Sequence, residues 1–543
     1  MNLGFRFSDL SVGIFLAACL FTFLIIIYSL KFMEGKKDLG KYYTCILITL
    51  GATAGVVFAS DYLTLLTFWG ILGATLYLLI GMGGVGAGTA AKKTFIIVGG
   101  TDALMIFGIG LIWAMTGSVM IGSIKIPLNG IFPILAFLSL AAGAFAKAGA
   151  VPFHTWIPDS AEVAPTTVMA YLPASLDKLL GIYLLTRICL DVFILVPNSP
   201  VSIFLMAIGS VTIITAVMAA LVQHDLKKLL SFHAVSQVGY MVLGIGTGIP
   251  VAMAGGLFHM LNHALYKSLL FLSAGSVEKQ AGTTELSRLG GLAKTMPVTF
   301  ACALIGALSI SGVPPLNGFM SKWMIYQGIV DLSGSSPYWI IWLLAAMFGS
   351  ALTLASFVKI IHAVFLGQGS ADMLKTKESS WLMWLPMAVL ASLCVIFGIF
   401  AYSIPIPFFI SKVIYGIQYS GFWNPVLAMI MLLVSLLLGI IFYFATGKAG
   451  TIVSKPAYIG GELLDVKEVR VSGINFYNTI VEIFPLPGIY RLAEKKVFDI
   501  YEIGKKASFW LSGLLSSLHD GRLGTYIAWL LFGAAVLFLI LVR

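Results

Sequence analysis

The feature that most constrains this chain is a series of long, uncharged apolar runs. Val12–Leu30, Trp381–Ala401 and Val426–Ala445 each approach the ~20 residues that a helix needs to cross a bilayer. Hydrophobic residues make up 59% of the chain and charged residues only 10%. A soluble domain carries about 25% charged residues. A soluble protein of this composition could not cover its own surface, so the sequence predicts an all-α membrane protein that crosses the bilayer many times.

Roughly 14 or 15 segments are long and apolar enough to be candidate spans. No Ser/Pro-rich linker divides the first 446 residues, so residues 1–446 are predicted to form one transmembrane bundle. The net charge of +10 forms no single basic patch, which argues against nucleic acid as a partner. The candidate spans lie near 10–30, 42–59, 62–82, 92–116, 131–150, 163–187, 203–222, 229–248, 251–275, 297–313, 316–332, 338–366, 381–401, 425–446 and 524–542.

Two of these segments are expected to be broken helices. The first contains Lys147–Pro152, and the second contains Gly312–Gly318 with Pro314 and Pro315. Proline removes a backbone donor and interrupts a helix. Irregular backbone at membrane depth persists only where protein or a wet cavity satisfies it. Two broken helices in two halves of one chain favour a transporter built from internal repeats.

The C-terminal part differs in composition. Residues 447–522 are predicted to form an interfacial or lateral arm, and residues 523–543 a final transmembrane helix. Within the arm, Ile489–Leu518 has helical periodicity, with apolar residues mostly on one side and charged residues on the other. This pattern is typical of a helix that lies along the membrane surface or against partner proteins.

Several ionisable residues lie inside apolar segments. A charged side chain at the bilayer centre costs at least ~2.5–3.5 kcal/mol, so each is a candidate for ion transport. The alternative without a transport function is that Lys147 lies near a helix end and extends its ammonium group to the membrane surface. Lys178 follows Asp177, but adjacent residues on a helix do not face each other, so an ion pair between them is not assured. The single candidates are Asp102, Lys147, Lys178, Lys322 and Lys359.

One segment carries a more specific pattern. His259, His263 and Lys267 are spaced by four and share one helical face. Two histidines at this spacing could bind zinc, but the H-E-x-x-H pattern fails at Met260 and no third ligand is in view. No metal or cofactor is therefore expected in this chain. A polar stripe through an apolar helix is better explained as a proton path.

Four linked motifs carry a family resemblance that covers about residues 5–400. They are Lys147–Pro165, with the sequence KAGAVPFHTWIPDSAEVAP, together with Asp225–Tyr240, His259–Gly275 and Leu308–Trp323. These stretches resemble the antiporter-like membrane subunits of respiratory complex I, energy-converting membrane-bound hydrogenases and Mrp-type sodium/proton antiporters.

The resemblance implies a fold and a set of roles. The fold would contain two inverted five-helix repeats, each with a broken helix. Lys147 would be the central lysine of the first half-channel, and Lys178 its connecting lysine. The stripe of His259, His263 and Lys267 would bridge to Lys322, the terminal lysine of the second half-channel.

One position departs from the family pattern. The family usually has a glutamate in a Trp-Glu motif that pairs with the first lysine, whereas this chain reads Phe68-Trp-Gly70. Asp102 matches an acidic family position in the next helix. We therefore expect Asp102 to substitute for the glutamate and to hold Lys147.

The function predicted from these features is that of a proton- or sodium-translocating subunit, without a redox centre, in a multisubunit complex. Partner membrane subunits, of the complex I or membrane-bound hydrogenase type, would couple electron transfer to ion movement. The expected location is the cell inner (plasma) membrane, where the chain would contact lipid. Two alternatives remain open: the membrane subunit of an inorganic-carbon uptake system, and a structural relative that no longer conducts ions because of Gly70.

Overall fold

The computed structural model describes residues 4–369, 373–418, 476–483 and 485–542, together with scattered positions between 430 and 441. The predicted span 425–446 and the predicted arm up to residue 475 therefore lie largely outside the described residues. The predicted boundary between residues 446 and 447 lies outside them too. The chain divides into two compact units, Met1–Glu482 and Ile483–Arg543.

The first half of the larger unit is helical apart from one short strand pair. Strand β1 (Ile126–Pro127) pairs in parallel with β2 (Phe193–Ile194). A π-helical turn at Leu172–Leu176 joins α7 (Thr166–Tyr171) to α8 (Asp177–Arg187), and Ile188–Val192 extends α8. One apolar segment therefore runs through Thr166–Val192. The helices are α1 (Asp9–Phe32), α2 (Leu39–Phe58), α3 (Tyr62–Gly81), α4 (Ala87–Thr116), α5 (Ile131–Ala148), α6 (Trp156–Val163), α7 (Thr166–Tyr171) and α8 (Asp177–Arg187).

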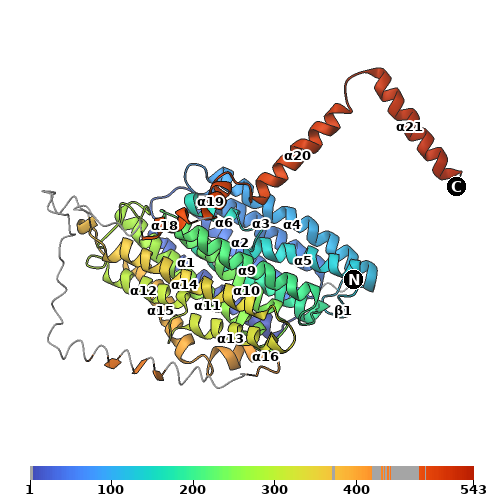
Figure 1. Ribbon diagram of the computed structural model, residues 1–543. Helices are drawn as coiled ribbons and strands as arrows, with labels where there is room; N and C mark the ends of the chain where they lie inside the picture. The colour runs from blue at the N-terminus through green and yellow to red at the C-terminus, as the bar shows by residue number, and fades with distance from the viewer. Residues whose placement is uncertain are drawn as a thin grey trace. The chain divides into compact units, whose positions relative to one another are not determined.

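The second half of this unit is also helical (Figure 1). Its main helices are α9 (Pro200–Leu221), α10 (Leu226–Gly246), α11 (Pro250–Ala281), α12 (Pro297–Ser311), α13 (Asn317–Asp331), α14 (Trp339–Ile361), α15 (Trp381–Ile399), α16 (Ser411–Val413) and α18 (Asn478–Glu482). Short 3₁₀ or π turns follow or link them at Leu332–Gly334, His362–Leu366, Met373–Lys375 and Ile406–Ile410.

Eleven helices within the described residues are long and apolar enough to cross a membrane. The prediction of an all-α protein with many membrane spans is confirmed. The inverted five-helix repeats stay a prediction.

The bundle has a buried centre and a lipid-suited exterior. Every residue in the most apolar part of Thr166–Val192 is buried, as is 94% of the corresponding part of α10. In α14, by contrast, only 28% of that part is buried. Helices α10 and α11 pack against each other within the bundle (Figure 1). The central helices are the ones that carry most of the ionisable side chains.

Both predicted breaks are present. Gly149, which has a φ of +80°, follows the end of α5, and Gly312, which has a φ of +79°, follows the end of α12. Only glycine adopts this left-handed conformation readily, which suits it to the position after a helix. Irregular backbone containing Pro152 follows the first glycine, and Pro314 and Pro315 follow the second. The predicted positions of the breaks are therefore correct.

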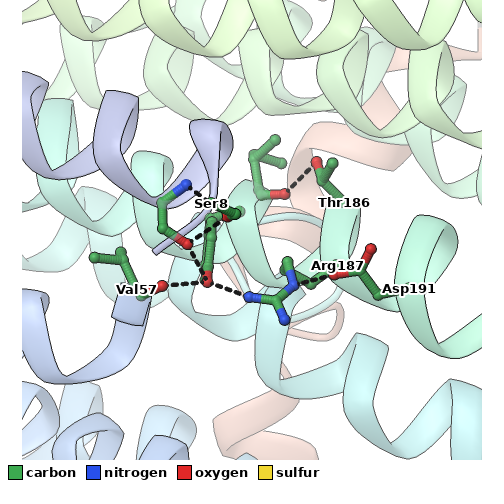
Figure 2. A network of polar contacts seen from close by, with 8 residues as sticks. Ser8, Val57, Thr186, Arg187 and Asp191 are labelled. Carbon is green, nitrogen blue, oxygen red and sulfur yellow. Dashed lines mark hydrogen bonds and ion pairs between the residues drawn. The ribbon is translucent and has the colours of Figure 1, made fainter. Parts of the chain in front are cut away.

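A polar network fastens one end of the first-half helices (Figure 2). The Tyr183 hydroxyl donates to the Val57 carbonyl at 2.7 Å and accepts from Arg187 at 2.6 Å. Arg187 also forms an ion pair with Asp191, and Ser11 lies 3.4 Å from the Tyr183 hydroxyl. The network joins α1, α2 and α8, so it accounts for Arg187 as a structural cation.

The smaller unit contains α19 (Leu486–Glu494), α20 (Ile500–Ser517) and α21 (Leu523–Leu541). The single helix predicted over Ile489–Leu518 is wrong, because the segment forms two helices. Lys496 has a φ of +56°, and Asp499 caps α20 by accepting a hydrogen bond from the Tyr501 amide. The predicted final span corresponds to α21, which is long and apolar enough to cross a membrane.

Candidate ion-translocation site

Lys147 lies in the last turn of α5, immediately before the first break. Its Nζ atom is 3.6 Å from Oδ1 of Asp177 on α8, and both side chains are almost fully buried. The Trp69 ring on α3 lies 5.5 Å from the same Nζ atom, within cation–π range. Lys147 is therefore held between a carboxylate and an aromatic face inside the bundle, and it is not a snorkelling lysine.

The expected partner of Lys147 was Asp102, and the structure places a different acid beside it. Asp102 lies near enough for an electrostatic influence on Lys147 but forms no ion pair with it, and its Oδ1 atom makes no hydrogen bond. At Gly70, a Cβ atom would meet no atom within 4 Å. The candidate site predicted from the sequence did not include Asp177. Its contact with Lys147 depends on the packing of α5 against α8, which the sequence does not show.

Lys178 is buried next to the first break. A Cβ atom at Gly149 would lie 3.1 Å from the Lys178 Nζ atom, so the unwound segment and this ammonium are in close approach. The Nζ atom makes no hydrogen bond. Lys178 is close enough to His263 and Lys267 on α11 for electrostatic interaction. Lys178 therefore lies near the polar stripe of α11.

The predicted stripe on α11 is formed by one continuous helix. His259, His263 and Lys267 are all fully buried. His259 is hydrogen-bonded on both sides, to Ser321 at 2.9 Å and to Gln237 at 3.1 Å. The Lys267 ammonium makes no hydrogen bond, and the His263 ring has one backbone partner, at Ala174. The middle and one end of the stripe thus retain free polar atoms.

A second stripe on α10 faces the first, and sequence reasoning did not single it out. His233, Gln237 and Tyr240 lie on one face of α10 and are fully buried. Gln237 bonds to His259, and the Tyr240 ring lies 5.6 Å from the His259 ring. The signal was present in the sequence, since His233 and Gln237 have the same spacing of four as the α11 residues.

Lys322 lies on α13, after the second break. Its Nζ atom donates to the Ile310 carbonyl at 2.8 Å and lies 4.8 Å from the centre of the Tyr240 ring. A Cβ atom at Gly312 would be 3.2 Å from the Lys322 side chain. A buried lysine therefore approaches a left-handed glycine at this break too, as Lys178 does at the first.

Lys359 is placed differently from the other lysines. Its Nζ atom donates to the carbonyls of Leu221 at 2.8 Å and Gln223 at 3.0 Å. A cation that binds the last carbonyls of a helix is a favourable cap. The structure thus gives Lys359 a structural role at the end of α9, and its role in an ion path stays a prediction.

Taken together, the geometry brings most of the predicted residues into one row. Electrostatic neighbours run from Lys147 and Asp177 to Lys178, then through the α11 stripe to Lys322. Protons can be exchanged along such a row. The groups that exchange them are lysines buried with a single carboxylate nearby and histidines with free ring nitrogens.

The sequence matches known families and proteins. Residues 59–353 match the family described as NADH:quinone oxidoreductase/Mrp antiporter, transmembrane, and residues 1–43 match the N-terminus of chain 5 of NADH-ubiquinone oxidoreductase (complex I). The chain is 32% identical over 403 residues to Na⁺/H⁺ antiporter subunit A1 of Staphylococcus epidermidis, which covers 69% of this chain and 50% of that protein. The same subunit of Staphylococcus aureus is 32% identical over 425 residues, 74% of this chain and 52% of that protein. The chain thus spans about half the length of these relatives.

Solved membrane complexes contain similar chains. The membrane-bound sulfane sulfur reductase, an archaeal respiratory membrane complex, has a chain that is 26% identical with a TM-score of 0.79, over 99% of this chain and 89% of that one. A chain of the Mrp complex from Dietzia has a TM-score of 0.69 at 22% identity, over 76% of this chain and 84% of that one. A chain of Thermus thermophilus complex I has a TM-score of 0.66 at 21% identity, over 75% of this chain and 84% of that one.

The family match covers more than half of the chain, and chains of solved membrane complexes share its fold. The chain therefore belongs to the NADH:quinone oxidoreductase/Mrp antiporter family of membrane subunits.

Proposed function

We propose that this chain is an ion-translocating subunit of a multisubunit membrane complex, and that protons or sodium ions move along its buried row of lysines and histidines. The observation that carries the proposal is the buried ion pair between Lys147 and Asp177, continued by Lys178 and the α11 stripe. Buried charges are costly, and within a membrane they mark ion paths. The relatives named as Na⁺/H⁺ antiporter subunits support the same reading.

In this proposal the first half of the path depends on Asp177. The carboxylate pairs with Lys147 and is also near enough to Lys178 for electrostatic interaction, so one negative charge is shared between two lysines. Exchange of a shared carboxylate changes which lysine carries charge, and this can move a proton along the row. The complex would provide the driving reaction through its other subunits, in a cell inner membrane.

Among the candidate complexes, the kind represented by the sulfane sulfur reductase, a respiratory membrane complex, is favoured by one observation. The chain from the sulfane sulfur reductase covers 99% of this chain, including the C-terminal unit, whereas the Mrp and complex I chains cover 76% and 75%. We therefore favour a complex in which electron transfer in other subunits drives the ion movement.

The proposal is tested by substitution of Lys267, which lies in the middle of the row. Lys267→Ala, in membrane vesicles that contain the assembled complex, should reduce ion uptake on the order of 10²-fold, the lower range for a positioned proton-transfer group. Lys228→Ala is the matched control, because Lys228 is half exposed and pairs with Glu162 at 2.5 Å. Uptake at the wild-type rate by an assembled Lys267→Ala complex would refute the proposal.

A further inference from the structure

The polar stripe on α10 extends further than the row described above. At one end of it, His233 on α10 is fully buried, and its Nε2 atom is hydrogen-bonded to the Ser356 hydroxyl on α14 at 2.7 Å. Its Nδ1 atom makes no hydrogen bond. A buried histidine with one satisfied and one free nitrogen has a donor or acceptor face to spare.

Lys267 lies near His233, and both contact the same aromatic ring. Its Nζ atom also makes no hydrogen bond and lies 5.6 Å from the centre of the Phe357 ring. The His233 ring packs on the same Phe357 ring, at 4.9 Å between centroids. The two side chains are electrostatic neighbours, so the unsatisfied ammonium and the unsatisfied imidazole nitrogen belong to one buried cluster.

Ser356 connects this cluster to one end of the bundle. Lys359 lies three residues further along α14, on the same helical face, and binds the carbonyls at the end of α9. The short α9–α10 connection therefore lies about one helical turn beyond Ser356. His259, at the opposite end of the α11 stripe, leads instead to Ser321 and Lys322.

We propose that His233 and Ser356 form a proton branch that leads from Lys267 to the α9–α10 end of the bundle. This inference rests on the proposed function, since it assumes that Lys267 carries a proton. It places Lys267 between two proton connections in series, one along α11 to Lys322 and one across α10 to α14, so that translocation needs both.

The proton transfer along the branch balances. The Lys267 ammonium loses a proton and the His233 Nδ1 atom gains it, so the lysine becomes neutral. The proton on Nε2 moves to the Ser356 oxygen, and the original hydroxyl proton leaves toward solvent water at the α9–α10 end. A positioned imidazole is suited to this relay because it can accept at one nitrogen while it donates from the other.

A purely structural role would give the same static contacts, because the hydrogen bond also ties α10 to α14. The two roles differ in what a substitution does. His233→Gln keeps a polar group that can bond to Ser356 but cannot relay a proton. Ser356→Ala removes the hydroxyl, and Ser356→Thr retains it. Thr353→Val is the matched control, because Thr353 is equally buried on α14 and bonds only within its own helix, to Gly349 at 2.7 Å.

The experiment measures proton translocation by the assembled complex in proteoliposomes, together with its thermal stability. We expect His233→Gln and Ser356→Ala to lose translocation on the order of 10²-fold. We expect Ser356→Thr and Thr353→Val to remain near wild type. If His233→Gln fails to assemble, the comparison of Ser356→Ala with Ser356→Thr decides. The branch is wrong if His233→Gln translocates normally, or if Ser356→Ala and Ser356→Thr behave alike.

Lys267→Ala, measured in parallel, separates the two claims. Loss of translocation in Lys267→Ala with normal translocation in His233→Gln would reject the branch and leave the proposed function standing. Normal translocation in Lys267→Ala would reject the proposed function itself.

Discussion

At the scale of single residues, burial decides which charges matter. Lys147 and Asp177 have side-chain exposures of 0% and 1%, and their Nζ and Oδ1 atoms are 3.6 Å apart. Removing one partner of a buried pair is typically destabilising by about 3–5 kcal/mol, because the other charge is left uncompensated. The exposed pair of Lys41 with Asp38 is screened by solvent and contributes little.

Substitution of Asp177 and of Asp102 tests which carboxylate acts as the partner of Lys147 during transport. Asp177→Asn should lower ion translocation on the order of 10²-fold, because it removes the only carboxylate paired with Lys147 among the described residues. Asp102→Asn should have a smaller effect, since Asp102 forms no ion pair there. The rates are compared at equal amounts of assembled complex. A larger loss in Asp102→Asn than in Asp177→Asn would contradict this assignment.

The residue types of the site could be predicted from the sequence, but their partners could not. Lysines and histidines within apolar segments stand out because charge there is rare. The partnership of Lys147 with Asp177, which are 30 positions apart in the sequence, depends on how α5 packs on α8. Lys359 has the same apolar surroundings as the other lysines, and only the position of the α9 carbonyls distinguishes its capping role.

At the scale of elements, the broken helices depend on close backbone packing. Gly398 on α15 lies against the second break, where a Cβ atom would be 2.1 Å from the Pro315 carbonyl oxygen. A Cβ atom at Gly318, at the start of α13, would lie even closer to the Ser309 carbonyl oxygen, at 1.8 Å. These glycines let neighbouring segments cover the unwound backbone at membrane depth.

A methyl group added at this contact should loosen the break. Gly398→Ala should lower the free energy of unfolding by about 1–3 kcal/mol, the usual range for overpacking. Gly110→Ala on α4 is the control, because a Cβ atom there meets nothing within 4 Å. Thermal unfolding of the detergent-solubilised protein measures both. Equal midpoints for the two variants would show that the contact does not limit the packing.

Helix breaks were predictable where the chain carries glycine and proline, and less so elsewhere. Pro152, Pro314 and Pro315 marked both membrane breaks correctly. The interruption between α19 and α20 was missed, although Asp499 is a favourable N-cap residue and was visible in the sequence. The continuous apolar periodicity of the flanking residues masked that local signal.

At the scale of the whole molecule, the C-terminal unit has an exposed apolar surface. Ile503, Trp510 and Leu514 lie on one side of α20 and have exposures of 49%, 71% and 49%. An apolar helix side of this kind is stabilised by contact with lipid or with partner subunits. Among the described residues of the smaller unit, none covers this apolar side of α20.

Charge placed on that side should weaken assembly. Trp510→Glu should shift the chain from the complex to a free form on native gels, because a carboxylate would have to be buried in an apolar contact. Ser512→Glu is the control on another side of the same helix. Retention of Trp510→Glu in the complex at the level of Ser512→Glu would show that α20 does not fasten the chain.

The central claim is that the buried row carries the transported ion, and Lys322 tests it most directly. Lys322 is 2% exposed, and its ammonium is bonded to the Ile310 carbonyl at the second break. The measurement is the number of ions translocated per turnover by the purified Lys322→Ala complex in sealed proteoliposomes. We predict that the complex assembles and turns over while its translocation falls on the order of 10²-fold. Translocation per turnover equal to that of the wild type would contradict the account.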